Sequence, residues 1–85
     1  MNQQILDIFQ EEAAECIQAV SKVKRFGIDN TYNGVCNRDH LEEEIGDMIA
    51  MIELIAEGDM INMSNVYKYA LAKKDKLRKW STIKV

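Results

Sequence analysis

The sequence predicts an all-α domain, a small bundle of three to four helices that is completed by oligomerisation. Three observations lead to this fold class. The 85 residues contain no proline, 47% of them are hydrophobic, and apolar positions recur with helical spacing over long stretches. Because a single domain of this length buries only a limited core, further copies are expected to complete it. We expect residues 1–85 to form one domain.

The first helix is predicted to run from about Asn2 to Arg25 or Phe26. Gly27 follows, and glycine suits the left-handed position just after a helix end. The next stretch, GIDNTYNGVCN (residues 27–37), is rich in Gly, Asn and Asp. Such a composition indicates a loop between the first and second helices.

The second helix is predicted to begin near Asn37 or Asp39 and to end at Gly58. Asp39 followed by Glu42 fits the spacing of a capping box, in which the first side chain accepts a main-chain hydrogen bond near the helix start. Apolar positions then recur with helical spacing up to the glycine, which indicates one continuous helix.

The third helix is predicted to begin after Ser64, a favourable N-cap, and to run to about Trp80. Residues 59–63, between the second and third helices, are interpreted as a turn or a short additional helix. The sequence contains no internal repeat and no low-complexity segment.

Charge is distributed unevenly along the chain. The net charge is −3; thirteen of the fourteen acidic residues lie at or before Asp59, and seven of the eleven basic residues lie at or after Lys68. A negative net charge argues against binding to nucleic acids or to membranes. Since a long apolar run, a signal peptide and a disulfide framework are also lacking, we expect a soluble, cytoplasmic protein with Cys16 as a buried free thiol.

Helical spacing places an acidic residue inside the apolar stripe of the first helix. That stripe consists of Ile5, Ile8, Phe9, Cys16, Ala19, Val20 and Val23. Glu12 falls inside the stripe and Glu15 lies at its margin, whereas Glu11 is further out. Because Glu12 and Glu15 are three residues apart, they are neighbours on one helix face.

The second helix repeats this arrangement. Its apolar face consists of Leu41, Ile45, Met48, Ile49, Met51, Ile52 and Ile55. Glu44 and Asp47, again three residues apart, project from within or beside that face. The other glutamates of this helix fall on the polar face and are interpreted as solvated charges: Glu42, Glu43, Glu53 and Glu57.

Four carboxylates beside buried faces need compensation, because burying an unpaired ionised carboxylate costs several kcal/mol or more. They could be protonated, pair with lysines of the third helix such as Lys73, Lys74 and Lys76, or bind a divalent cation. All four offer oxygen ligands, which suit Mg²⁺ or Mn²⁺ and not structural zinc. His40, the only histidine, lies outside both pairs and is interpreted as a surface residue. Helical geometry alone leaves the charge network and the metal site equally open.

Two acidic motifs resemble the signature of a known family. EEAAE (residues 11–15) followed by EIGD (residues 44–47) is similar to the EExxE…ExxD signature of the MazG-like nucleotide pyrophosphohydrolases, an all-α superfamily. LEEEIGDMIAMIELI (residues 41–55) looks like the second motif helix of that family. ALAKKDKLRKW (residues 70–80) resembles the basic closing helix of its short members. The resemblance covers about residues 5–80.

The resemblance implies hydrolysis of (deoxy)nucleoside triphosphates between the α- and β-phosphates, giving a monophosphate and pyrophosphate. It implies that Mg²⁺, with Mn²⁺ as a substitute, is bound by four carboxylates: Glu12, Glu15, Glu44 and Asp47. Glu12 or Glu15 would then be the catalytic base that accepts a proton from the attacking water. By approximate match, Lys73 and Lys76 are candidates for binding the substrate's phosphates. The family also implies a homo-oligomer, either a dimer or a tetramer.

A competing interpretation is a non-catalytic helical oligomerisation module. Its inward carboxylates would pair with lysines of a partner subunit and so determine the register of the assembly. Binding of nucleic acid through the basic tail is not favoured, because Asp75 interrupts the tail and no recognised reading motif is present. The preferred base and sugar are not predicted.

Overall fold

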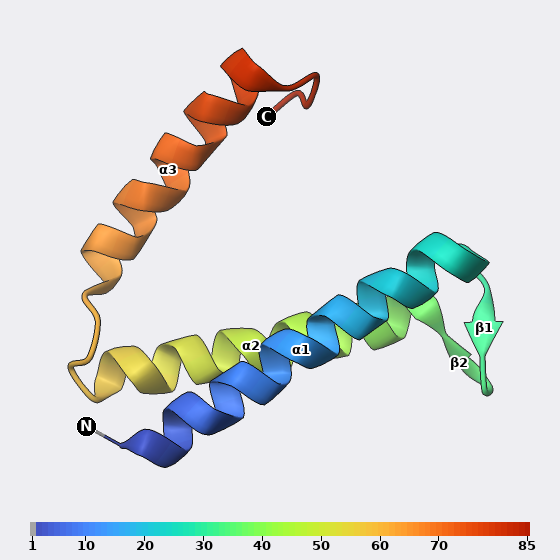
Figure 1. The fold of residues 1–85 in the computed structure, drawn as a ribbon, viewed down its shortest axis with the longest axis horizontal. Coiled ribbons are helices and arrows are strands. Elements are labelled where there is room, and N and C mark those ends of the chain that lie inside the picture. The colour runs from blue at the N-terminus through green and yellow to red at the C-terminus, as the bar shows by residue number, and fades with distance from the viewer. Residues whose placement is uncertain (1) are drawn as a thin grey trace.

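The computed structural model describes residues 2–85, which form three helices with a short β-hairpin between the first two (Figure 1). The all-α fold class is therefore confirmed. The elements in chain order are α1 (Gln3–Phe26), β1 (Thr31–Tyr32), β2 (Val35–Cys36), α2 (Asn37–Glu57) and α3 (Met63–Trp80).

α1 has the limits that the sequence predicts. The side chain of Asn2 caps its start by accepting a hydrogen bond from the main-chain N–H of Gln4 at 3.0 Å. At the other end Gly27 has a φ of 96°, and its N–H donates to the carbonyl of Val23 at 2.8 Å. A Cβ on Gly27 would lie 2.9 Å from Nδ2 of Asn30, a side-chain end that can move, so it is the positive backbone angle that favours glycine here.

The stretch interpreted as a loop, residues 27–37, instead contains an antiparallel hairpin of two-residue strands. Asn33 and Gly34 form its turn with φ values of 52° and 79°, the positive angles that a type I′ turn needs. The strands pair in the register Thr31–Cys36 and Tyr32–Val35. An Asn-Gly pair is a strong sequence signal for such a turn, so this signal was available in the sequence.

α2 begins at Asn37, so the capping box predicted at Asp39 and Glu42 is wrong. The residue at the N-cap position is Cys36, whose side chain makes no capping hydrogen bond. The helix start is held by Asn37 instead, which is 2% exposed and whose Nδ2 donates to the carbonyl of Gly27 at 2.9 Å. The hairpin therefore ties the start of α2 to the end of α1.

α2 ends at Glu57, next to the predicted Gly58. The N–H of Gly58 donates to the carbonyl of Leu54 at 3.1 Å, but its φ of −81° is open to any residue. The left-handed residue is Asp59, with a φ of 60°. The segment up to α3 is a turn, which is one of the two predicted alternatives.

α3 begins two residues earlier than predicted, and Ser64 is not its N-cap. That position is occupied by Asn62, whose side chain accepts a hydrogen bond from the N–H of Asn65 at 3.2 Å. Asparagine and serine are both favourable N-caps, and sequence spacing alone does not choose between two that lie so close together. α3 ends at Trp80, as predicted.

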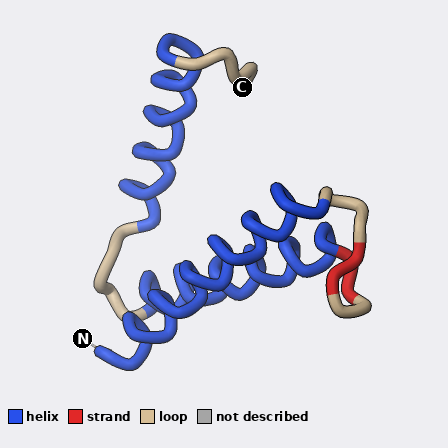
Figure 2. The backbone as a smooth tube through the Cα atoms, turned by 45° about the vertical axis from the view of Figure 1, so that its right-hand side comes forward, coloured by secondary structure: helices blue, strands red, loops and turns tan. Residues whose placement is uncertain are grey.

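α1 and α2 lie side by side as an antiparallel pair, and α3 leaves the end of α2 in another direction (Figures 1 and 2). The radius of gyration is 15.4 Å, against about 12 Å for a compact chain of this length. The buried apolar residues all belong to the α1–α2 pair: Ala19, Met51 and Ile55. The core therefore lies between α1 and α2, and α3 has no fully buried residue.

Parts of the predicted apolar faces remain exposed in the described chain. Val20 is 44% exposed, Ile45 is 46% exposed and Ile49 is 50% exposed, although helical spacing places all three on inward faces. α1 and α2 cover each other along one side only, so the rest of each face lacks a partner within residues 2–85. Over the same residues, no helix combines the length and the apolar content that a membrane span requires.

Candidate metal centre

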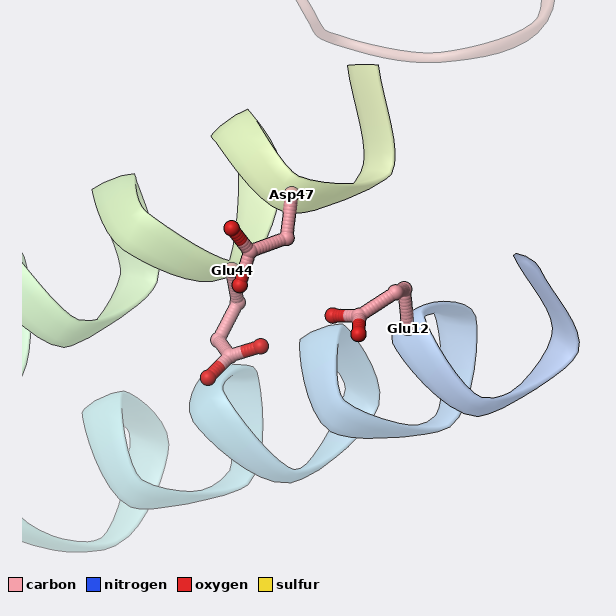
Figure 3. A group of neighbouring side chains, drawn as sticks. All are labelled: Glu12, Glu44 and Asp47. Atoms are coloured by element: carbon pink, nitrogen blue, oxygen red, sulfur yellow. The ribbon is translucent and has the colours of Figure 1, made fainter. Parts of the chain in front are cut away.

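Three carboxylates from two helices meet at the contact between α1 and α2. Glu12 extends from α1, and Glu44 and Asp47 extend from α2, so that one oxygen of each lies within 4.8 Å of the others. Figure 3 shows the three groups gathered in the space between the two helices. Because Glu44 and Asp47 are one turn apart, they share a face of α2, and the antiparallel partner places Glu12 opposite them.

Glu44 is the most deeply buried member of the cluster. The residue is 4% exposed, and its Oε2 has no hydrogen-bond partner in the part of the chain that the structure describes. Its Oε1 lies 3.2 Å from Nε2 of His40. A buried carboxylate oxygen without a partner is costly, so Oε2 has the properties of a ligand atom.

The cluster is closed at one side and open at the other. Glu12 is half-buried and Asp47 is exposed, in contrast to the buried Glu44. A ligand that binds at the three carboxylates can therefore also contact solvent or a second molecule on the Asp47 side. This is the arrangement expected of a reactive metal site, which must admit a substrate, and a fully enclosed structural site would lack it.

Crowding and burial raise the pKa of two of these carboxylates. Burial is the main cause for Glu44; the charge of Glu15 adds to it, and His40 opposes it. Burial is also the first cause of the raised pKa of Glu12, followed by the charge of Asp47. A bound divalent cation stabilises the ionised forms and so offsets both effects.

Glu15, the fourth predicted ligand, is exposed and is not one of the three gathered oxygens. It does lie near Glu44, because its negative charge is one of the causes that raise the pKa of Glu44. Glu11 is exposed on α1, which agrees with its predicted outer position. The structure thus brings Glu12, Glu44 and Asp47 together and leaves Glu15 beside them.

A protein-family model matches most of this chain. The description of that model is MazG nucleotide pyrophosphohydrolase domain, and it matches residues 1–81. The chain belongs to the MazG family. No curated protein and no solved structure is similar enough to count as a match. The resemblance seen in the two acidic motifs is confirmed, and these motifs carry the carboxylates that meet between α1 and α2 of the MazG domain.

The interpretation of His40 as a surface residue holds only in part. Its side chain is 26% exposed, and its Nε2 lies against the Glu44 carboxylate. His40 and Glu44 are four residues apart on α2, so they share one face of the helix. That spacing was visible in the sequence, and it was overlooked because His40 does not belong to either acidic motif of the MazG domain.

Cys16 is a free thiol, as predicted, although it is half-buried and not fully buried. Its Sγ donates to the main-chain carbonyl of Glu44 at 3.2 Å. Burial and the charge of Glu44 raise the pKa of this thiol, which keeps it protonated and able to donate. Cys16 therefore contacts the MazG carboxylate cluster indirectly, through the backbone of α2.

No lysine or arginine of residues 2–85 forms an ion pair with any of the four predicted ligands. Arginines pair with acidic residues elsewhere, in Arg38–Asp29 and Arg78–Asp75. Lys73 and Lys76 are exposed on α3, which extends away from the α1–α2 pair (Figure 1). Within one chain the structure therefore does not bring the lysines of α3 to the carboxylates of the MazG domain.

A small pocket of about 140 Å³ adjoins the hairpin. His40 forms part of its wall, so the pocket is adjacent to the residue that contacts Glu44. The ring of Tyr32 forms another part and stacks on Phe26, with ring centroids 5.3 Å apart. Nζ of Lys22 lies 5.0 Å from the centroid of the Tyr32 ring. The pocket thus combines an aromatic ring from the hairpin with a cationic group from α1, and His40 connects it to the acidic cluster.

Proposed function

We propose that this MazG domain hydrolyses (deoxy)nucleoside triphosphates between the α- and β-phosphates, releasing a monophosphate and pyrophosphate. The observation that carries the proposal is the buried, unpartnered Oε2 of Glu44, which lies in a cluster of carboxylates from two helices within the described residues. Membership of the family supports the class of reaction. The proposed cofactor is Mg²⁺, which Mn²⁺ can replace.

The donor atoms fit such a cation. Carboxylate oxygens are the ligands that Mg²⁺ and Mn²⁺ prefer. Two ligands on opposite sides of Mg²⁺ lie about 4.2 Å apart. Oxygens that already lie within 4.8 Å of one another therefore need only small side-chain rotations to bind one ion. We assign Glu12, Glu44 and Asp47 as ligands, and Glu15 as a fourth ligand or as the neighbouring base.

The roles of the side chains follow from where they lie. A bound Mg²⁺ supplies charge neutralisation for the triphosphate and a water molecule of lowered pKa. Glu44 and Asp47 hold the site from α2, and Glu12 holds it from α1. Glu15 is exposed beside Glu44, so its carboxylate is available to accept the proton of the attacking water. Glu12 is the other candidate for this role.

We also propose that the active form is a homo-oligomer. A cleft of about 610 Å³ between α2 and α3 is lined mainly by apolar side chains, including Ile49, Val66 and Tyr67. Most of the stability of a helix in a protein comes from the packing of its apolar face, and α3 has no buried residue in its own chain. A second copy would supply the missing contacts. In that assembly Lys73 and Lys76 would contact the phosphates of a nucleotide held by a neighbouring protomer.

The test is incubation with a panel of nucleoside triphosphates and Mg²⁺, with the products separated by chromatography. Pyrophosphate and the monophosphate are the expected products. Release of orthophosphate would contradict the assignment of the cleaved bond. Absence of turnover with every nucleotide would contradict the enzyme and would favour the oligomerisation module.

A further inference from the structure

The geometry points to His40 as a positioning residue that holds the Glu44 carboxylate so that Oε2 alone binds the metal. This inference rests on the proposed function, because it concerns the same metal site. It assigns different roles to the two oxygens of Glu44. It also assigns a role to the one histidine, which lies outside both acidic motifs of the chain.

The first step of the argument is the contact itself. Nε2 of His40 lies 3.2 Å from Oε1 of Glu44, one turn further along α2. The two groups form an ion pair when the imidazole is protonated, because an ionised carboxylate oxygen attracts a positively charged ring. The histidine side chain is 26% exposed and the glutamate side chain 5% exposed. Both groups are therefore packed, and the contact with Nε2 restricts rotation of the carboxylate.

The second step is the difference between the two oxygens. Oε1 lies 3.2 Å from Nε2 of His40, while Oε2 is buried and has no hydrogen-bond partner in the described chain. A carboxylate that binds a metal through both oxygens needs both of them to face the ion. The contact with His40 turns Oε1 toward the imidazole, so Glu44 is set up as a ligand with one donor atom.

The third step concerns the choice of metal. Mg²⁺ demands near-ideal octahedral geometry, whereas Ca²⁺ accepts more ligands and often binds both oxygens of one carboxylate. A Glu44 that offers Oε2 alone fits the smaller ion better than it fits Ca²⁺. His40 therefore favours Mg²⁺ or Mn²⁺ over Ca²⁺ without contacting the ion. Removal of the His40 contact frees Oε1, which weakens this preference.

A direct contact between His40 and the substrate would be a different role. His40 also lines the small pocket beside the hairpin, so a nucleotide bound there would touch the imidazole. Metal binding measured without any nucleotide separates the two roles. Only the positioning role affects the metal affinity in that measurement.

The experiment measures binding of Mn²⁺ and of Ca²⁺ by titration calorimetry, without nucleotide, in the full chain and its variants. His40→Phe keeps a ring and removes the donor, and His40→Gln keeps an N–H donor. Asp39→Asn is the matched control, since Asp39 is an exposed neighbour on α2. Circular dichroism reports folding; if His40→Phe does not fold, the smaller His40→Met takes its place.

We expect His40→Phe to weaken Mn²⁺ binding by about 10- to 100-fold, the usual effect of removing a group that orients a ligand. Ca²⁺ binding should fall by less, so the preference for Mn²⁺ decreases. His40→Gln should recover most of the loss, and Asp39→Asn should bind like the original chain. Unchanged Mn²⁺ binding in His40→Phe, or an equal loss for both ions in both histidine variants, would overturn the inference. Failure of the original chain to bind Mn²⁺ would instead overturn the proposed metal site and its function.

Discussion

The thiol of Cys16 on α1 donates a hydrogen bond to the main-chain carbonyl of Glu44 on α2, over 3.2 Å. Cys16 is four residues beyond Glu12 on the same face of α1. This hydrogen bond therefore joins the two helices one turn away from Glu12. It fixes the position of Glu12 along the axis of α2. A free cysteine, which belongs to neither acidic motif, thus contributes to the alignment of the candidate metal ligands.

We predict that Cys16→Ala lowers the free energy of unfolding by about 1 kcal/mol, since it removes one hydrogen bond at a half-buried position. It should also weaken Mg²⁺ binding, because Glu12 is no longer held opposite α2. Cys16→Ser retains a donor and should lose less of both. Urea unfolding and calorimetry provide the two measurements; identical metal affinity in Cys16→Ala would contradict the aligning role.

Glu44→Gln should reduce nucleotide turnover by ~100-fold or more, because it replaces the charge of the most buried ligand and removes the acceptor Oε2. The matched control is Glu43→Gln, which makes the same chemical change on the exposed face of α2 and should leave turnover close to that of the original chain. Steady-state assays at saturating Mg²⁺ compare the two. Equal turnover in both variants would exclude Glu44 from the site.

The raised pKa of Glu12 and of Glu44 predicts a dependence of stability on pH in the metal-free protein. A carboxyl group with a raised pKa holds its proton more tightly in the folded state than in the unfolded state. Its favourable contribution is therefore complete below its ordinary pKa of 4.5 and declines as the pH rises through the raised value. Between these two values the free energy of unfolding should fall.

This dependence is measured by urea unfolding over a pH series in the presence of a chelator. Glu44→Gln has no carboxyl group to ionise at this position, so its stability relative to the original chain should increase above pH 4.5. Addition of Mg²⁺ should reverse the difference, because the ion binds the ionised form. If the free energies of unfolding of the two proteins change in parallel over the whole pH range, ionisation of Glu44 is not the cause of the pH dependence.

Two glycines should respond in opposite directions to alanine. Gly46 lies inside α2, and a Cβ added there would meet nothing within 4 Å, so Gly46→Ala should stabilise the helix by ~1 kcal/mol. Gly27→Ala should destabilise the protein by more than this gain, because its φ of 96° is strained for a residue with a Cβ. Thermal unfolding measures both. A loss of stability in Gly46→Ala would mean that another copy of the chain packs against this position.

Replacement of Lys73 and Lys76 by alanine should raise KM for the nucleotide by ~10-fold each, as expected for loss of a charged hydrogen bond. Mn²⁺ binding without nucleotide should be unaffected, since both lysines belong to α3, which extends away from the α1–α2 pair of its own chain (Figure 1). Lys74→Ala is the control from the same stretch of α3. A KM that rises equally in all three variants would indicate a general effect of charge and not a specific phosphate contact.

The helices could be predicted because their signals are local. α1 combines long apolar periodicity with a terminating Gly27, and both features lie within the helix or next to it. The hairpin also had a local signal in Asn33-Gly34, which the loop-like composition around it obscured. The N-cap of α3 was misplaced because Asn62 and Ser64 are both suitable and only the path of the chain selects one.

The sequence predicts those features of the site that depend only on which face of a helix a residue occupies. Spacing alone places Glu12 and Glu44 inward, and the two do meet. Which part of a face is covered depends on the partner helix, and so the exposure of Val20 and Ile49 could not be predicted from either helix alone. The direction of α3 was unpredictable for the same reason, since few contacts within the chain determine it.

Because α3 is separated from the α1–α2 pair, the proposed metal ligands and the proposed phosphate-binding lysines depend on different concentrations. The carboxylates come from α1 and α2 of one chain, so occupancy by a cation would not depend on how much protein is present. The lysines would reach a nucleotide only across protomers, so their contribution depends on how much protein is present. On dilution, such a protein would keep its metal and lose its catalytic efficiency, and its own abundance would then regulate it.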